Sequence, residues 1–134
     1  IKAALVILDY KKLIKGQAQA IILNSGIANA CTGQEGLKDA ERVCKELAMR
    51  LKISEDEVYV ASTGVIGVRL PMEKMLKGIK QLVDNLGKAA PEDVAKAIMT
   101  TDTFPKTYTK IFNLGEKEVR LLGIAKGAGM ISPD

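Results

Sequence analysis

The sequence of 134 residues contains no histidine, and this absence excludes several kinds of catalytic site. Serine–histidine–aspartate and cysteine–histidine catalysis both use an imidazole as the general base. Protein zinc sites also commonly take histidine as a ligand, so no metal centre is expected. An enzyme built on this chain must therefore take its general base from another group.

Cysteines, aromatic residues and long apolar runs are scarce as well. Two cysteines, Cys31 and Cys44, are too few for a disulfide framework and indicate a reducing compartment, so we expect a cytoplasmic protein. Only 4% of the residues are aromatic, and the 20 Lys and Arg are scattered, which argues against nucleic-acid binding. The apolar run at residues 18–23 has the length of a strand, so no membrane segment is expected.

The remaining pattern predicts one compact α/β unit over residues 1–134. The chain is 47% hydrophobic and long enough to bury a core. The near-continuous apolar content of residues 18–24 predicts a strand covered on both faces. The expected elements are strands at 3–8, 18–24 and 58–61, helices at 34–51, 72–86 and from 91 onward, and a hairpin of 107–114 and 118–124.

The central stretch is Val-Ala-Ser-Thr-Gly-Val-Ile-Gly at residues 60–67, between an expected strand and an expected helix. We expect residues 62–67 to form the turn that joins them. Such a turn can present main-chain N–H groups and a threonine hydroxyl to developing negative charge. The alternative is a plain strand–turn–helix joint, and glycine serves turns so often that this stretch alone favours it.

Two further segments are rich in small and polar residues. Residues 24–33 follow an expected core strand and are longer than a connection between neighbours requires, so they form a candidate wall of a site. Residues 99–106, with three threonines and an aspartate, follow directly on a helix. Both segments are also compatible with ordinary loops, because Asn, Ser, Gly and Thr favour turns and helix ends.

Taken together, these segments resemble one family. The sequence Ala-Asn-Ala-Cys-Thr-Gly within residues 24–33, then residues 61–67 and 99–106, and finally Lys-Gly-Ala-Gly-Met-Ile-Ser-Pro-Asp at 126–134 occur in that order. The combination resembles the α chain of glutamate N-acetyltransferase/ornithine acetyltransferase, the self-cleaving enzyme of arginine biosynthesis. The resemblance covers nearly all of the sequence. Ile27 departs from it, since the family usually has asparagine there, and we expect the family's preceding segment and cleavage point to lie outside this sequence.

This resemblance implies a fold and partners. The expected fold is α/β (α+β), a layered sandwich of helices and a mixed sheet in a self-processing enzyme of the N-terminal-nucleophile type. A β chain cleaved from the same precursor would complete it, in an α2β2 heterotetramer. The N-terminal threonine of that β chain is the expected nucleophile, and its own α-amino group supplies the base, so the lack of histidine is no obstacle. No cofactor and no metal are expected.

The resemblance also implies roles for four residues. Thr63 and Gly64 match an oxyanion-hole pair, and Thr100 and Lys126 match substrate-binding residues, with the neighbouring Thr101 as an alternative to Thr100. The implied reaction is ping-pong transfer of an acetyl group from N-acetylornithine to glutamate. Acetyl-CoA as an additional donor is left open.

Two other functions are compatible with the same residues. One is a self-processing amidase or aminopeptidase, in which water instead of glutamate takes the acyl group. The other is a non-catalytic α/β assembly domain. The nucleophile and the other substrate-contacting groups would lie on the β chain, so this sequence alone does not separate the three.

Overall fold

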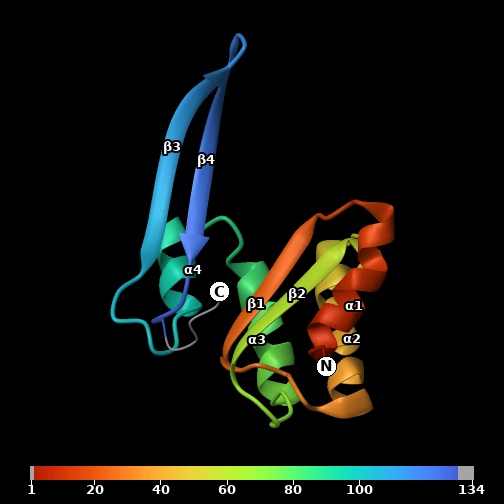
Figure 1. Ribbon diagram of the computed structural model, residues 1–134. Helices are drawn as coiled ribbons and strands as arrows, with labels where there is room; N and C mark the ends of the chain where they lie inside the picture. The colour runs from red at the N-terminus through yellow and green to blue at the C-terminus, as the bar shows by residue number, and fades with distance from the viewer. Residues whose placement is uncertain (1, 130–134) are drawn as a thin grey trace. The chain divides into compact units, whose positions relative to one another are not determined.

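The computed structural model describes residues 2–129 and divides into two compact units, with the boundary between Lys88 and Ala89 (Figure 1). Each unit is described by itself. The single unit expected from the sequence stays a prediction.

The first unit combines helices with a two-stranded parallel sheet. Its elements are α1 (Ala4–Lys12), η1 (Leu13–Lys15), β1 (Ala20–Ile27), α2 (Gly33–Leu51), η2 (Glu55–Glu57), β2 (Val58–Val65) and α3 (Met72–Asp84). Strands β1 and β2 pair in parallel from Ala20↔Val58 to Ile27↔Val65. Because parallel neighbours cannot be joined by a tight hairpin, the chain crosses over through α2. Helices α2 and α3 confirm the two long helices predicted from the apolar periodicity.

Helix α1 contradicts the sequence prediction. The apolar run at residues 3–8 predicts a strand, but residues 4–8 lie within α1 and Ala3 is its N-cap. The buried residues of this helix are Ala4, Leu8 and Lys12, which are spaced four apart and so share one face. A short apolar run cannot be assigned to strand or buried helix by periodicity alone.

The core of the first unit lies on one face of the sheet. Ile22, Val58 and Val60 turn toward the helices and are at most 7% exposed. On the opposite face, Ile21 is 63% and Leu23 is 44% exposed. Within the described residues one face is covered, and cover of the other face stays a prediction.

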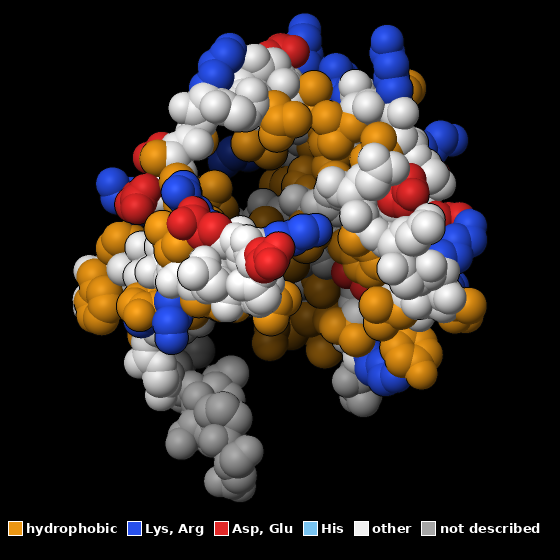
Figure 2. Space-filling view, turned by 90° about the horizontal axis from the view of Figure 1, so that it is seen from above, with side chains coloured by type: hydrophobic (Ala, Val, Ile, Leu, Met, Phe, Trp, Pro, Cys, Tyr) orange, Lys and Arg blue, Asp and Glu red, His pale blue; other side chains and the backbone are white. Residues whose placement is uncertain are grey.

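The second unit consists of a short helix, α4 (Pro91–Ala97), and an antiparallel hairpin of β3 (Lys106–Leu114) and β4 (Lys117–Ala125). Pro91 occupies the first turn of α4, and Asp93 Oδ2 accepts the main-chain N–H of Ala90 at 2.9 Å, as the helix-start signals predict. The predicted hairpin is confirmed. Among the described residues after Lys88, Ala95 is the one buried hydrophobic residue. Figure 2 shows many hydrophobic side chains open to solvent on the face that it presents.

Candidate functional site

The predicted turn at residues 62–67 is mostly strand. β2 continues through Val65, so Thr63 and Gly64 lie within it, and the bend follows at Ile66 and Gly67. In the parallel register Ser25 pairs with Thr63 and Gly26 with Gly64. The structure thus brings two of the segments that the sequence singled out side by side, at the carboxyl ends of β1 and β2.

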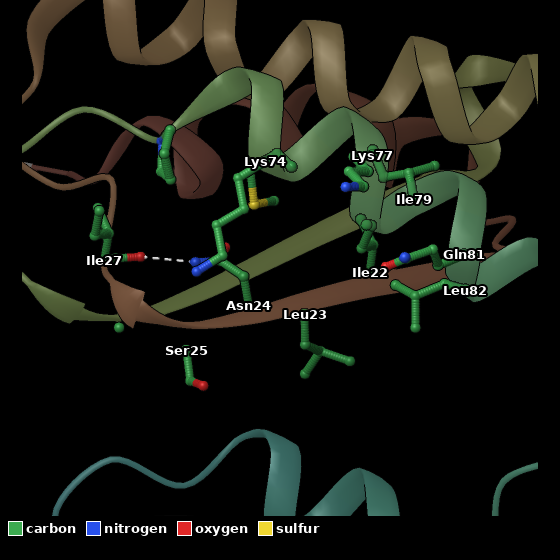
Figure 3. Close-up of a pocket in the computed structure, with 14 residues that line it drawn as sticks. Ile22, Leu23, Asn24, Ser25, Ile27, Lys74, Lys77, Ile79, Gln81 and Leu82 are labelled. Carbon is green, nitrogen blue, oxygen red and sulfur yellow. Dashed lines mark hydrogen bonds between the residues drawn. The ribbon is translucent and has the colours of Figure 1, made fainter.

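Side chains alternate between the two faces at this end of the sheet. Ser62 is two residues beyond the buried Val60, so its side chain lies on the same face of the sheet as those of Val58 and Val60. Its Oγ donates to Asn24 Oδ1 at 2.6 Å. Asn24 Nδ2 in turn donates to the carbonyl of Ile27 at 3.0 Å, the dashed bond in Figure 3. The odd-numbered Thr63 belongs to the opposite, open face.

Gly64 sits where no other residue fits. Its φ is +131°, and a Cβ placed there would lie 2.2 Å from the carbonyl carbon of Gly26 and 2.3 Å from its oxygen. Gly26 also has a positive φ, of 109°. The close approach of the strands requires glycine at 64, whereas at 26 the positive φ alone favours glycine, because a Cβ placed there meets no heavy atom within 4 Å.

The two edges of β2 have different main-chain partners. The carbonyls of Glu57 and Val65 accept bonds from residues flanking β1, so the odd-numbered residues of β2 face that strand. Main-chain polar groups alternate along a strand, and Val58 and Val60 turn theirs to the other edge. Regular alternation would turn the Gly64 N–H toward the same outer edge.

Two side chains of α1 occupy the first part of this outer edge. Lys12 is 6% exposed, and its Nζ donates to the carbonyls of Val58 at 2.7 Å and Glu55 at 3.1 Å. The carboxylate of Asp9 accepts the N–H of Val60 at 3.2 and 3.3 Å. Burial raises the pKa of Asp9, against the opposing effects of the Val60 bond and the Lys12 charge. Sequence reasoning missed both roles because it did not recognise the helical spacing of Lys12 behind Leu8.

The loops beyond the two strands are tied to α2. Asn29 is fully buried, donates through Nδ2 to the carbonyl of Gly36 at 2.9 Å and accepts at Oδ1 from the Thr32 hydroxyl at 2.8 Å. After β2, Arg69 binds the buried carboxylate of Asp39 through Nε and Nη2, both at 2.9 Å. Part of the polar 24–33 segment therefore anchors the start of α2.

A groove of about 620 Å³ lies between β1 and α3 (Figure 3). Ile22 and Asn24 lie on the side toward α3, whereas Leu23 and Ser25 point away from it. The groove is lined by Ile22, Leu23, Asn24, Ser25, Gly26, Ile27, Pro71, Lys74, Met75, Lys77, Gly78, Ile79, Gln81 and Leu82.

The second pair of predicted site residues meets within the second unit. Lys126 Nζ donates to Thr100 Oγ1 at 2.7 Å, although 26 positions separate them in the sequence. Thr100 is exposed and Lys126 is half-buried. Residues 130–134 of the C-terminal motif lie outside the described residues.

Asp102 connects the two segments that carry this pair. Its Oδ2 accepts the N–H of Thr100 at 3.2 Å, and its Oδ1 accepts the N–H of Gly127 at 2.5 Å and Lys106 Nζ at 2.8 Å. The Asp102 side chain is 1% exposed. The Lys106 ammonium, followed by the Gly127 N–H, holds the pKa of this carboxyl well below its usual range. The sequence placed this aspartate in the threonine-rich segment but gave no sign of its contact with Gly127.

Metal and membrane signals were sought over residues 2–129. In that range no group of three or more His, Cys, Asp or Glu side chains is arranged to hold a metal ion. No helix in the same range is both long and apolar enough to cross a bilayer.

Comparison with known proteins decides the family. The model of the ArgJ family matches residues 1–134, the whole chain. The chain belongs to the ArgJ family. It is 54% identical over 134 residues to the arginine biosynthesis bifunctional protein ArgJ of Caldanaerobacter subterraneus subsp. tengcongensis, and 50% identical to that of Geobacter sulfurreducens. Each match covers all of this chain but only 33% and 34% of the relative, so the chain spans about a third of their length.

Solved structures of the ArgJ family share the fold. The chain is similar to ArgJ of Bacillus halodurans, with a TM-score of 0.89 and 38% identity, over 100% of this chain and 71% of that one. It is similar to an ornithine acetyltransferase of Mycobacterium tuberculosis, solved in complex with ornithine, with a TM-score of 0.90 and 39% identity, over 100% and 72%. The expected family and the mixed α+β fold class are confirmed.

Proposed function

We propose that the chain is the α chain of an ornithine acetyltransferase of arginine biosynthesis, which transfers an acetyl group from N-acetylornithine to glutamate. The observation that carries the proposal is the family match over the whole chain, at up to 54% identity to the relatives named above. The M. tuberculosis relative is an ornithine acetyltransferase that binds ornithine. The glutamate half-reaction rests on the resemblance of the motifs.

The first half-reaction forms an acetyl-enzyme. The hydroxyl of the β chain's N-terminal threonine loses its proton to the threonine's own α-amino group, whose ordinary pKa is about 7.7–8.0. The oxygen bonds to the acetyl carbon of N-acetylornithine and produces a tetrahedral oxyanion. The C–N bond then breaks, the ornithine nitrogen takes the proton, and an acetyl ester of the threonine remains.

The second half-reaction returns the enzyme to its starting state. The amino group of glutamate attacks the ester carbon and gives a second oxyanion. The C–O bond breaks, the threonine oxygen regains a proton, and N-acetylglutamate leaves. The cycle balances without a cofactor, and both substrates use one site in turn.

Thr63 and Gly64 are the proposed oxyanion donors. They are consecutive, and they follow the buried part of β2. The close approach of Gly64 to Gly26 restricts the main chain at this position. Donors held in place before reaction need no reorganisation as the charge develops, which is why such sites are effective.

Thr100 and Lys126 are the proposed substrate-binding pair. Their side chains are in contact at 2.7 Å and present a hydroxyl and an ammonium together. Both amino-acid substrates carry a carboxylate, which accepts charge-assisted hydrogen bonds from such groups. We further propose the β chain as partner, an α2β2 assembly and a cytoplasmic location.

The test is Thr63→Ala in the full-length protein, with ornithine release from N-acetylornithine as the assay. Loss of one oxyanion donor lowers kcat by about 10²–10³, while KM changes little because the donor acts in the transition state. Thr63→Ser keeps the hydroxyl and is the matched control, expected to retain most activity. Near-normal turnover of Thr63→Ala would remove Thr63 from the mechanism, and acetyl transfer to water in place of glutamate would favour the amidase alternative.

A further inference from the structure

Asp102 is a nearly enclosed carboxylate of the second unit that accepts hydrogen bonds from main-chain groups. Its side chain is 1% exposed, although the hairpin beside it is largely open to solvent. Three donors converge on it from three places: the N–H of Thr100, the N–H of Gly127 and the ammonium of Lys106. A nearly buried carboxylate is retained where its oxygens are satisfied in this way.

These contacts join the two segments that carry the substrate-binding pair. Thr100 lies in the loop between α4 and β3, whereas Gly127 follows β4 and is the residue directly after Lys126. One carboxylate thus binds the main chain of Thr100 itself and the peptide that adjoins Lys126. The Lys126 Nζ to Thr100 Oγ1 contact spans the same two segments.

We propose that Asp102 is a positioning residue, which holds Thr100 and Lys126 side by side for substrate binding by cross-linking the main chain of their two segments. This rests on the proposed function of that pair. Lys106 anchors the carboxylate from β3, so that its oxygens stay directed at the two N–H groups. Asp102 does not itself touch substrate in this arrangement.

The experiment is a double-mutant cycle between Asp102→Asn and Lys126→Met in the full-length protein, with KM and kcat measured for both amino-acid substrates. Asparagine at 102 keeps the size of the side chain but replaces one carboxylate oxygen with an NH2 group. That group cannot accept the hydrogen bonds that the carboxylate oxygen accepts. We expect KM to rise about tenfold or more for both substrates, with a much smaller change in kcat, since the loss is one of charge-assisted bonding in the binding site. The double variant should then be little worse than Lys126→Met alone, because Asp102 acts through the pair that is already lost.

Asp93→Asn is the matched control. Asp93 also accepts a main-chain N–H, that of Ala90, and it caps α4. If such a carboxylate acts only structurally, its loss lowers stability but leaves KM unchanged. We therefore expect Asp93→Asn to leave both KM values at the wild-type level.

The outcomes separate this proposal from the one it rests on. If Lys126→Met raises KM but Asp102→Asn does not, or if the two effects multiply in the double variant, the positioning role is overturned while the proposed function stands. If neither Lys126→Met nor Thr63→Ala changes the kinetics, the proposed function itself fails. Should Asp102→Asn not accumulate as folded protein, Lys106→Met decides: a rise in KM that vanishes in the Lys126→Met background supports the proposal, and an unchanged KM overturns it.

Discussion

The two units hold their candidate residues in physically different ways. In the first unit Gly64 is held by packing: its backbone touches Gly26, and Val58 and Val60, earlier in the same strand, are buried in the core. In the second unit, where Ala95 is the one buried hydrophobic among the described residues, Thr100 and Lys126 are held by hydrogen bonds and charge around Asp102.

This difference determines how each region responds to change. Close packing does not depend on protonation and is not screened by salt, so the contact between Gly64 and Gly26 should respond mainly to changes of volume and backbone freedom. A network built on a carboxylate and an ammonium depends on protonation, so the second unit should respond to pH and to removal of charge.

The largest effect is expected from Gly64→Ala. The added methyl would lie 2.2–2.3 Å from the carbonyl group of Gly26, and φ of +131° is strained for any residue with a Cβ. We expect a loss of at least about 2 kcal/mol in the free energy of unfolding, measured by urea denaturation of the full-length protein.

Gly78→Ala is the control for Gly64→Ala. Gly78 lies within α3, and no heavy atom lies within 4 Å of a Cβ placed on it. Alanine there should stabilise the protein by up to about 1 kcal/mol, because glycine is a poor helix former. Equal losses for both variants would show that the approach of β1 and β2 is not tight at Gly64.

A smaller loss is expected from Lys12→Met, which removes a buried charge from the first unit. The substitution leaves the carbonyls of Val58 and Glu55 without their ammonium donor. We expect a loss of about 1–3 kcal/mol in the free energy of unfolding. Lys11→Met, at the exposed neighbouring position, should stay within about 0.5 kcal/mol of wild type. A neutral Lys12→Met would mean that packing alone docks α1 on β2.

The smallest effect, and the sharpest contrast, is the pH dependence of two carboxylates with opposite pKa shifts. The folded pKa of Asp9 is raised above its ordinary value of 3.8, so the folded state binds this proton more tightly and Asp9 favours folding more as pH falls through the raised pKa. The folded pKa of Asp102 is lowered below 3.8. Its contribution is therefore full above 3.8 and is lost as pH falls toward the lowered pKa.

The measurement is the free energy of unfolding of wild type, Asp9→Asn and Asp102→Asn between about pH 3 and pH 6. As pH falls, the stability of wild type relative to Asp9→Asn should rise, and its stability relative to Asp102→Asn should fall. Slopes of the same sign for both pairs would contradict the contrast between the two sites.

Much of the fold could be predicted because it rests on local patterns. Helices α2 and α3 follow from apolar residues at spacings of three and four, and the hairpin follows from two alternating runs around Gly115. These patterns depend on neighbours in the chain and are readable without knowing what they pack against. The family was readable for a similar reason, because its motifs occur in a set order.

The sequence by itself therefore determined the family, the mixed α+β class and the position of Thr63 and Gly64 in the chain. Only the tertiary structure decided that residues 4–12 are a helix, since Ala4, Leu8 and Lys12 find their partners in distant segments. It alone showed that Gly64 must be glycine because Gly26 lies against it, and that Asp102 joins segments 25 residues apart. Contacts of that kind join residues whose separation along the chain follows no local period, so no pattern in the sequence encodes them.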